Sequence, residues 1–297
     1  GRAELHSEST EVAEPTLYVV ATPIGNLRDI TLRALDTLKS VDAIAAEDTR
    51  VSRKLLVHFG IQAHLIPTHE HNEREAAQRL VALLSQGKSV ALIADAGTPA
   101  ISDPGAIAVA QVRAAGFRVV SVPGPSAITT AIAAAGLQSA SFCFHGFLPA
   151  RKGEREKLLA ALKAQCELQV FYEAPHRIVE SIASIAAVFG GDRRIGIARE
   201  LTKLFEQVHV CRLEEAADWL EQSENHRRGE FGLLVEGARE AASAQGESDS
   251  RRVLEILLQE LPLKQAVELS AAITGAKKNA LYEQALKLKK ESSENRK

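Results

Sequence analysis

The sequence lacks the features by which several classes of protein are recognised. It contains no run of about 20 apolar residues without a charge, which excludes a membrane-spanning helix. Residues 1–14 are polar, include four glutamates and lack the basic start and apolar run of a signal peptide, so we interpret residues 1–15 as a disordered leader. The three cysteines, Cys143, Cys166 and Cys211, lack metal-binding spacing and cannot all pair, which favours a reducing, cytoplasmic location. Methionine is absent, and no physical argument explains that lack.

Three catalytic signatures are also missing. The dinucleotide fingerprint G-x-G-x-x-G and the phosphate loop G-x-x-x-x-G-K-[ST] do not occur, so dehydrogenase and NTPase activities lose their main support. The nucleophile elbow G-x-S-x-G does not occur either, which argues against a serine hydrolase.

The composition is that of a soluble globular protein, with 45% hydrophobic and 25% charged residues. Its 297 residues exceed one ordinary core, since domains usually contain about 100–200 residues. The net charge of −2 does not indicate a nucleic-acid-binding protein. Residues 251–297, however, hold ten Lys/Arg against six Asp/Glu, a local balance of +4, and residues 151–157 also lean basic. A solvated face is the default interpretation of both segments, and RNA contact is the alternative.

Short β-branched runs alternate with amphipathic segments in the first half of the chain. The predicted strands are residues 16–22, 42–46, 64–67, 89–94 and 118–122. The predicted helices are residues 31–38, 50–59, 73–86, 107–115 and 126–135, three of which end at Gly60, Gly87 and Gly116. This alternation predicts an α/β domain over residues 16–137 with a mostly parallel sheet.

The pattern restarts to give a second α/β domain, predicted over residues 138–238. Its predicted strands are residues 142–147, 168–172, 194–198, 207–212 and 232–236, and its helices 154–164, 176–189 and 214–222. The last strands have few helices between them, so we expect part of this sheet to be antiparallel.

The chain after residue 238 is predicted to form a linker followed by a helical domain. Residues 239–250 are rich in Ala, Ser, Glu and Gly, which indicates a linker. Helices predicted over 251–260, 264–274 and 277–289 form a small bundle over residues 251–290, with a disordered tail over 291–297. The tight turn at Gly275 is similar to that of a helix-turn-helix unit.

Polar and small residues gather where the first five predicted strands end. Ligands of open α/β sheets bind at these carboxyl ends. The segments are residues 22–31, 47–50, 68–72, 95–105 and 123–127. Small residues let a ligand approach the backbone, and Asp95 and Asp103 can accept hydrogen bonds from hydroxyl or amine groups. Two Gly/Pro-rich loops at one sheet edge therefore predict a small-molecule pocket.

Two of these segments have competing interpretations. Glu47 and Asp48 beside Arg50 fit an ordinary helix cap with a salt bridge as well as they fit catalysis. His69 and His71 have the spacing of metal ligands but no third ligand nearby, so we predict polar contacts to a ligand and no metal site.

Nine short motifs, in one order, resemble the RsmI family from residue 16 to about 290. They are TPIGNL (22–27), AEDTR (46–50), DAGTP (95–99), PGPSA (123–127), HGFLP (145–149), FYEAPHR (171–177), ARELTK (198–203), GE (229–230) and KKNALY (277–282). The resemblance departs at Gly232, where the family pattern leads us to expect a larger apolar residue.

The resemblance implies 2′-O-ribose methylation of a cytidine in 16S ribosomal RNA of the small ribosomal subunit, with S-adenosylmethionine as the cofactor. It also implies a homodimer and a fold like that of the tetrapyrrole methylases, in which two α/β domains hold the active site in the cleft between them. The implied cofactor contacts are Pro23, Asp95, Ala96, Gly97, Thr98, Ile101, Ser126 and Ala127 from the first domain, and Tyr172, Leu201 and Glu230 from the second.

Such a reaction is an in-line displacement by a ribose hydroxyl at the sulfonium methyl carbon. The leaving group is neutral, so alignment is the enzyme's main task, and a general base helps because the hydroxyl is weakly acidic. The candidate bases, unranked, are Glu47, Asp48, His71 and Glu173. The expected RNA contacts are Arg28, Arg50, Arg53, Arg177, Lys203, Lys277 and Lys278.

Two other functions remain open from the sequence. C-methylation of a tetrapyrrole would keep the fold, but it would not need the basic C-terminal helices. A non-catalytic RNA-binding assembly factor would not need the residue 95–98 and 123–127 loops.

Overall fold

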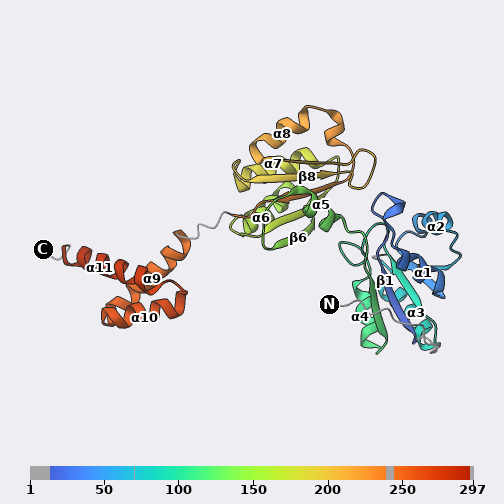
Figure 1. Ribbon diagram of the computed structural model, residues 1–297, viewed down its shortest axis with the longest axis horizontal. Helices are drawn as coiled ribbons and strands as arrows, with labels where there is room; N and C mark the ends of the chain where they lie inside the picture. The colour runs from blue at the N-terminus through green and yellow to red at the C-terminus, as the bar shows by residue number, and fades with distance from the viewer. Residues whose placement is uncertain (1–13, 70, 239–243, 295–297) are drawn as a thin grey trace. The chain divides into compact units, whose positions relative to one another are not determined.

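The first half of the chain forms a five-stranded parallel sheet in the order β3-β2-β4-β1-β5 (Figure 1). The computed structural model describes residues 14–69, 71–238 and 244–294. The strands are β1 (Thr16–Val20), β2 (Ala43–Ala46), β3 (His64–Pro67), β4 (Val90–Ile93) and β5 (Arg118–Val122). The predicted parallel sheet is confirmed, and the carboxyl ends of all five strands lie at one edge.

Helices cover both faces of this sheet. They are η1 (Leu27–Asp29), α1 (Leu32–Ser40), α2 (Thr49–His58), α3 (Glu73–Ser85) and α4 (Ala106–Ala114). Buried side chains of α3 and α4 pack with Leu17 and Leu92 on one face, and those of α1 and α2 pack with Val20 and Ile93 on the other. Because neighbouring strand residues point to opposite faces, burial on both faces explains why these strands are almost wholly apolar.

The second sheet is mixed, with strand order β6-β7-β10-β8-β9. Its strands are β6 (Phe142–Phe147), β7 (Leu168–Glu173), β8 (Arg194–Arg199), β9 (Gln207–Arg212) and β10 (Phe231–Val235). Only β6 and β7 pair in parallel, and the other three pairings are antiparallel, as the scarcity of helices predicts. One face is covered by α6 (Lys152–Leu162), α7 (Ile178–Phe189) and α8 (Leu213–Glu221), and η2 (Glu224–Arg227) follows α8.

Helix α5 (Ala127–Ala135) packs on the second sheet and not on the first. Its Ile128 and Ala131 share a core cluster with Val170 and Leu234. The structure therefore moves the packing boundary from residue 137 to the loop before α5, while both sheets belong to one compact unit. The prediction missed this because the helix is almost uniformly small and apolar, which leaves no pattern to show which sheet it covers.

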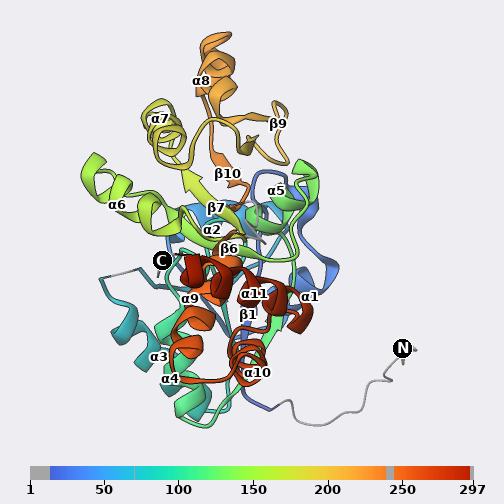
Figure 2. The same cartoon turned by 90° about the vertical axis from the view of Figure 1, so that its left-hand side faces the viewer.

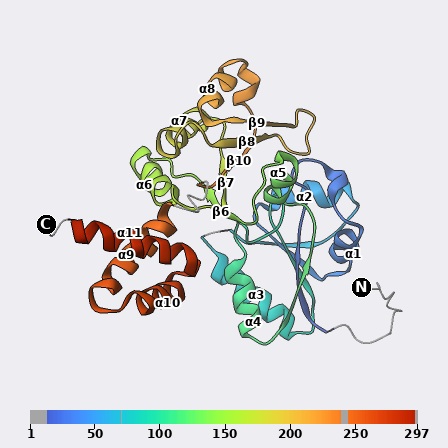
Figure 3. The same ribbon diagram turned by 60° about the vertical axis from the view of Figure 1, so that its left-hand side comes forward.

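The C-terminal unit is a small bundle of three helices, shown in Figures 2 and 3. They are α9 (Ala244–Glu260), α10 (Leu263–Thr274) and α11 (Lys278–Glu294). Leu254, Val267 and Leu281 are buried among them, and Gly275 ends α10 in the left-handed conformation.

Two boundaries of this unit differ from the prediction. Helix α9 begins inside the predicted linker 239–250, because Ala, Gln and Glu favour a helix there despite Gly246. Helix α11 extends into the predicted tail 291–297 as far as Glu294. Residues 239–243, 295–297 and the leader up to residue 13 lie outside the described residues. Among the described helices, none is long and apolar enough to cross a membrane.

Candidate functional site

The loops after β1 and β4 are joined at the carboxyl edge of the first sheet. The backbone amides and carbonyls of Thr22 and Gly97 exchange two hydrogen bonds of 3.0 Å. The Thr22 hydroxyl, which is buried, donates to the Ala94 carbonyl at 3.2 Å. Gly97 has φ +79°, and a Cβ there would lie 3.2 Å from Ile24 Cγ2. Two predicted cofactor loops are thus held in one fixed arrangement.

Three carboxylates meet where β2 and β4 end. The Asp48 amide donates to Asp95 Oδ1 at 2.9 Å, and the Glu47 carboxylate accepts a hydrogen bond from the Asp95 backbone. Burial and the nearby Asp95 carboxylate raise the pKa of Glu47. Asp48 behaves differently because its carboxylate accepts from the Arg50 amide at 2.8 Å and pairs with the Arg50 guanidinium at 2.8 Å. Asp48 is therefore the N-cap of α2. The hydrogen bonds from Arg50 lower the pKa of Asp48 to about 2.

Asp103, predicted with Asp95 as a hydrogen-bond acceptor of the pocket, joins this group. Burial, and repulsion from Glu47 and Asp95, raise the pKa of Asp103 to about 6. Tyr172 from the second sheet lies close enough for the Asp103 charge to affect it, since burial and then Asp103 raise the pKa of Tyr172 to about 12. The loop's sequence indicates that Asp103 can accept hydrogen bonds, but it does not reveal the burial and the neighbouring charges that raise its pKa.

The loop that carries Asp103 has a strained backbone. Ala100 and Ser102 have φ of 67° and 59°, in the left-handed region that non-glycine residues rarely adopt. Glu200 and Thr202 of the second sheet are left-handed too, with φ of 50° and 68°. Strain of this kind persists only where the surrounding structure imposes it, and it is enriched at functional sites.

The start of α5 offers unused hydrogen-bonding groups. Ser126 is the N-cap residue, yet its side chain makes no capping hydrogen bond, so the first-turn amides beginning at Ala127 are not satisfied by their own cap. Thr98 Oγ1 donates to the Pro125 carbonyl at 3.2 Å, which ties this turn to the β4 loop. Ala96 and Ile101 are exposed beside it. A helix N-terminus with free amides suits a carboxylate.

Lys203, in the loop after β8 of the second sheet, forms ion pairs with two glutamates. Its ammonium lies 3.1 Å from Glu200 Oε1 and 3.0 Å from Glu230 Oε2. Burial acts to lower the pKa of Lys203, but the hydrogen bonds to Glu230 and Glu200 outweigh it and raise the pKa. A Cβ on Gly25 would lie 2.6 Å from Lys203 Cγ, so the β1 loop and this lysine are in contact.

The structure locates the remaining cofactor candidates of the second sheet. Tyr172 is half-buried against Phe144 and Phe147, with ring centroids 4.8 and 5.6 Å away. Leu201 is buried in the cluster that includes Ile128 of α5.

Glu173 and Arg177, predicted as a candidate base and as an RNA contact, form a buried ion pair. Glu173 is 2% exposed, and its carboxylate accepts from the Arg177 guanidinium at 2.8 Å, the Ser181 hydroxyl at 2.5 Å and the Ala174 amide at 2.8 Å. Arg177 also donates to the Leu148 carbonyl at 3.1 Å. Both groups are committed to a buried network, so we revise the catalytic and RNA-binding roles predicted for them to structural ones.

The other predicted residues are at the surface. His71 is exposed, 6.2 Å from the ring of His69, and no group of three possible metal ligands occurs among the described residues. Arg28, Arg50 and Arg53 are exposed on η1 and α2 beside the site. Lys277 and Lys278 are exposed in the separate C-terminal unit.

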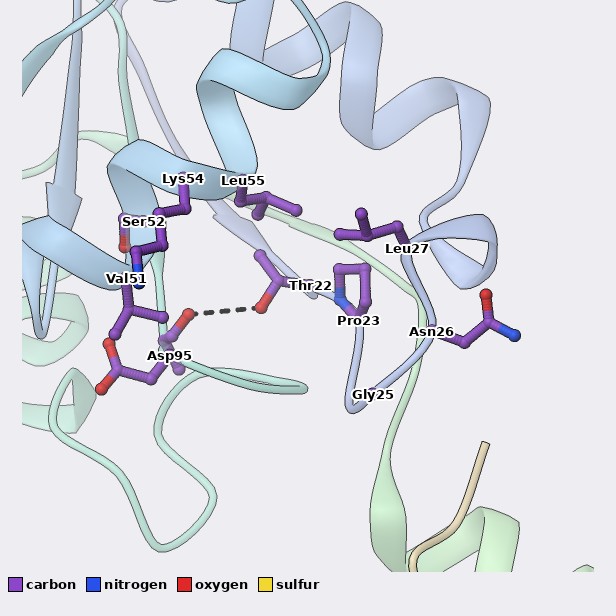
Figure 4. Close-up of a pocket in the computed structure, with 11 residues that line it drawn as sticks. Thr22, Pro23, Gly25, Asn26, Leu27, Val51, Ser52, Lys54, Leu55 and Asp95 are labelled. Atoms are coloured by element: carbon purple, nitrogen blue, oxygen red, sulfur yellow. Dashed lines mark hydrogen bonds between the residues drawn. The ribbon is translucent and has the colours of Figure 1, made fainter. Parts of the chain in front are cut away.

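A cavity of about 260 Å³ opens beside the β1 and β4 loops (Figure 4). Its wall is formed by the β1 loop on one side and α2 on the other. The lining residues are Thr22, Pro23, Gly25, Asn26, Leu27, Val51, Ser52, Lys54, Leu55, Ala94 and Asp95. Only Pro23 and Asp95 of the predicted cofactor contacts are among them.

Comparison with known proteins identifies the family. The model of the tetrapyrrole (corrin/porphyrin) methylases matches residues 16–217, and that of the RsmI C-terminal HTH domain matches residues 244–289. Ribosomal RNA small subunit methyltransferase I of Escherichia coli O157:H7 is 49% identical, covering 94% of this chain and 97% of that protein. The protein of the same name from Pseudomonas aeruginosa is 52% identical, covering 91% and 96%.

Solved structures support the fold. The methyltransferase CobJ has a TM-score of 0.57 at 20% identity, covering 75% of this chain and 95% of that one. Uroporphyrin-III-C-methyltransferase from Thermus thermophilus has a TM-score of 0.53 at 19% identity, covering 74% and 94%. The resemblance noted in the sequence is confirmed: the chain belongs to the tetrapyrrole methylase family, and within it to the group of ribosomal RNA small subunit methyltransferase I.

Proposed function

We propose that this protein transfers a methyl group from S-adenosylmethionine to the 2′-hydroxyl of a cytidine in 16S ribosomal RNA of the small ribosomal subunit. The observation that carries the proposal is the joined pair of loops after β1 and β4, in a chain about half identical to proteins named for methylating that RNA. We further propose that the protein is cytoplasmic and acts as a homodimer.

The residues present fit the proposed cofactor. The amides at the start of α5 suit its carboxylate, and Asp95 or Asp103 suits its ammonium or ribose hydroxyls. Exposed Ala96 and Ile101 offer a small and an apolar surface for the adenosyl part. In this proposal Tyr172, Leu201 and Glu230 complete the site from the second sheet. When bound, the cofactor supplies an electrophilic methyl group on a sulfonium.

Among the candidate bases, Glu47 is best suited to take the ribose proton. A carboxylate with a raised pKa is a better proton acceptor near neutral pH than an ordinary one. Asp48 and Glu173 are occupied as a cap and in a buried ion pair, and His71 is exposed on the loop after β3. Asp103 is a second candidate, because its pKa of about 6 also leaves it ionised at neutral pH.

Binding of the RNA backbone is assigned to exposed cations. Arg28, Arg50 and Arg53 lie beside the site, while Lys203 is engaged by two glutamates and holds the second-sheet loop in place. Lys277 and Lys278 give the C-terminal helical unit a basic surface for docking. Because the net charge is −2, we expect RNA affinity to depend on these local groups.

The test is methyl transfer from tritiated S-adenosylmethionine to small ribosomal subunits that lack the modification. Digestion to nucleosides should recover the label on 2′-O-methylcytidine. Absence of label from RNA, with cofactor binding measured by isothermal titration, would overturn the proposal. Label on an added tetrapyrrole instead would assign C-methylation.

A further inference from the structure

We propose that the cavity between the β1 loop and α2 is the pocket for the base of the acceptor nucleotide, with Lys54 binding its phosphate. This inference rests on the proposed function and deepens it by naming where the acceptor enters. The cavity is the one lined by Pro23, Leu27, Val51 and Leu55 together with the polar groups at its edge.

The position of the cavity is the first argument. Pro23 and Asp95 line this cavity, and the loop of Asp95 continues to Asp103 and is tied through Thr98 to the turn before Ser126. An acceptor base in the cavity would therefore lie next to the loop at which we propose that the cofactor binds. In-line transfer requires the ribose hydroxyl to reach the methyl carbon on the side away from the sulfur, and neighbouring acceptor and cofactor sites allow that approach.

The size and lining of the cavity are the second argument. Of the predicted cofactor contacts only Pro23 and Asp95 line it, so we assign it to the acceptor and not to the adenosyl group. Its volume of about 260 Å³ lies just below the usual range for ligand pockets, about 300–1,000 Å³, and suits a part of a ligand such as one base. Figure 4 shows Leu55 of α2 near Pro23 and Leu27 of the β1 loop, and these three side chains give the apolar surface that a flipped-out base requires.

Charge is the third argument. Helix α2 carries Arg50, Arg53 and Lys54 and no acidic residue. Arg50 is paired with Asp48, whereas no hydrogen bond or ion pair engages the Lys54 ammonium within the described part of the chain. An apolar slot with an unpaired cation at its edge complements a nucleotide, which has a ring face and an anionic phosphate.

Filling the cavity tests the proposal. Val51 is 43% exposed at the edge, so Val51→Phe should fold, because Phe and Val have similar helix propensity. The matched control is Val57→Phe, on the same helix but 69% exposed and outside the cavity. We expect Val51→Phe to lower kcat/KM for small subunits about tenfold or more while the cofactor Kd stays unchanged, and Val57→Phe to alter neither.

A second readout does not depend on turnover. Saturation-transfer NMR with cytidine 5′-monophosphate should show contact to the base protons in the wild type and in Val57→Phe, but not in Val51→Phe. Lys54→Ala should raise the KM for RNA and reduce its salt dependence by about one ion, unlike Lys88→Ala on an exposed lysine before β4.

The outcomes separate the two proposals. If the wild type methylates RNA and Val51→Phe does so equally, the pocket is wrong and the function stands. If Val51→Phe loses cofactor binding, the cavity belongs to the cofactor and the inference is wrong. If the wild type methylates no RNA, the proposed function fails, and unchanged base contacts in Val51→Phe would then reject the pocket as well.

Discussion

Gly25 of the β1 loop lies directly against the side chain of Lys203 from the second sheet. A Cβ on Gly25 would be 2.6 Å from Lys203 Cγ and 2.8 Å from its Cε. The ammonium of the same lysine is held by Glu200 and Glu230. The absence of a side chain at Gly25 therefore lets Lys203, from the loop after β8, pack against the loop after β1.

We expect Gly25→Ala to displace Lys203 and lower methyl transfer about tenfold or more, since a displacement of about 1 Å can cost a hundredfold. Stability should also fall by about 1–3 kcal/mol, because φ of +159° at Gly25 is disfavoured for a residue with a Cβ. The double variant with Lys203→Ala removes the two closest contacts of the new Cβ and leaves Thr202 Oγ1 at 3.0 Å, so the effects on kcat/KM should be non-additive in a double-mutant cycle. Additive effects would show that the contact does not matter.

Glu47→Gln should lower kcat about a hundredfold, the usual range for a lost general base. Burial and Asp95 raise the pKa of Glu47, and the base must be ionised, so the wild-type rate should fall as pH drops through that raised pKa. The variant should lose this dependence. Asp48→Asn is the matched control, because asparagine caps a helix as well as aspartate and should retain activity. Single-turnover rates from pH 5 to 9 check both.

Asp103→Asn should stabilise the protein at neutral pH. The pKa of Asp103 is about 6 in the folded protein, above the ordinary value of 3.8, so its contribution to stability is greatest below pH 3.8 and is lost as pH rises through 6. Removing the charge should raise the Tm at pH 7.5 and have little effect at pH 4. An equal shift at both pH values would contradict the raised pKa.

The sequence predicted the ten strands well because their apolar runs end in recognisable polar or glycine-rich loops. The carboxyl-edge loops of the first sheet followed from the rule that parallel strands end together. What it could not predict were the neighbours of individual groups. Glu173 and Glu47 both stand at the end of an apolar strand. Only Glu173 is bound by an arginine and a hydroxyl, from Arg177 just before α7 and Ser181 within it.

The buried pair of Glu173 and Arg177 should be needed for stability and not for RNA binding. Arg177→Met would leave the Glu173 carboxylate, which is 2% exposed, without its partner, at a cost of about 3 kcal/mol. Arg53→Met, on the surface of α2, should change stability by less than about 0.5 kcal/mol. Urea unfolding measures both. A loss of RNA affinity by Arg177→Met without a loss of stability would restore the role that the sequence suggested.

Two glycines with different surroundings should respond oppositely to alanine. At Gly232, where the family resemblance led us to expect a larger residue, a Cβ would lie 3.6 Å from Ala131 Cβ and 3.8 Å from Ala198 Cβ, which are ordinary contacts. Gly232→Ala should therefore stabilise the protein by about 0.5 kcal/mol, since glycine weakens a strand.

At Gly97, φ of +79° disfavours alanine, and its Cβ would press on Ile24 at 3.2 Å. Gly97→Ala should cost about 1–2 kcal/mol and weaken cofactor binding, because strain there shifts the bridge to Thr22. Thermal unfolding and isothermal titration with S-adenosylmethionine check the pair. Similar behaviour of both variants would mean that the β4 loop adapts freely, which would remove the reason to treat its geometry as preorganised for the cofactor.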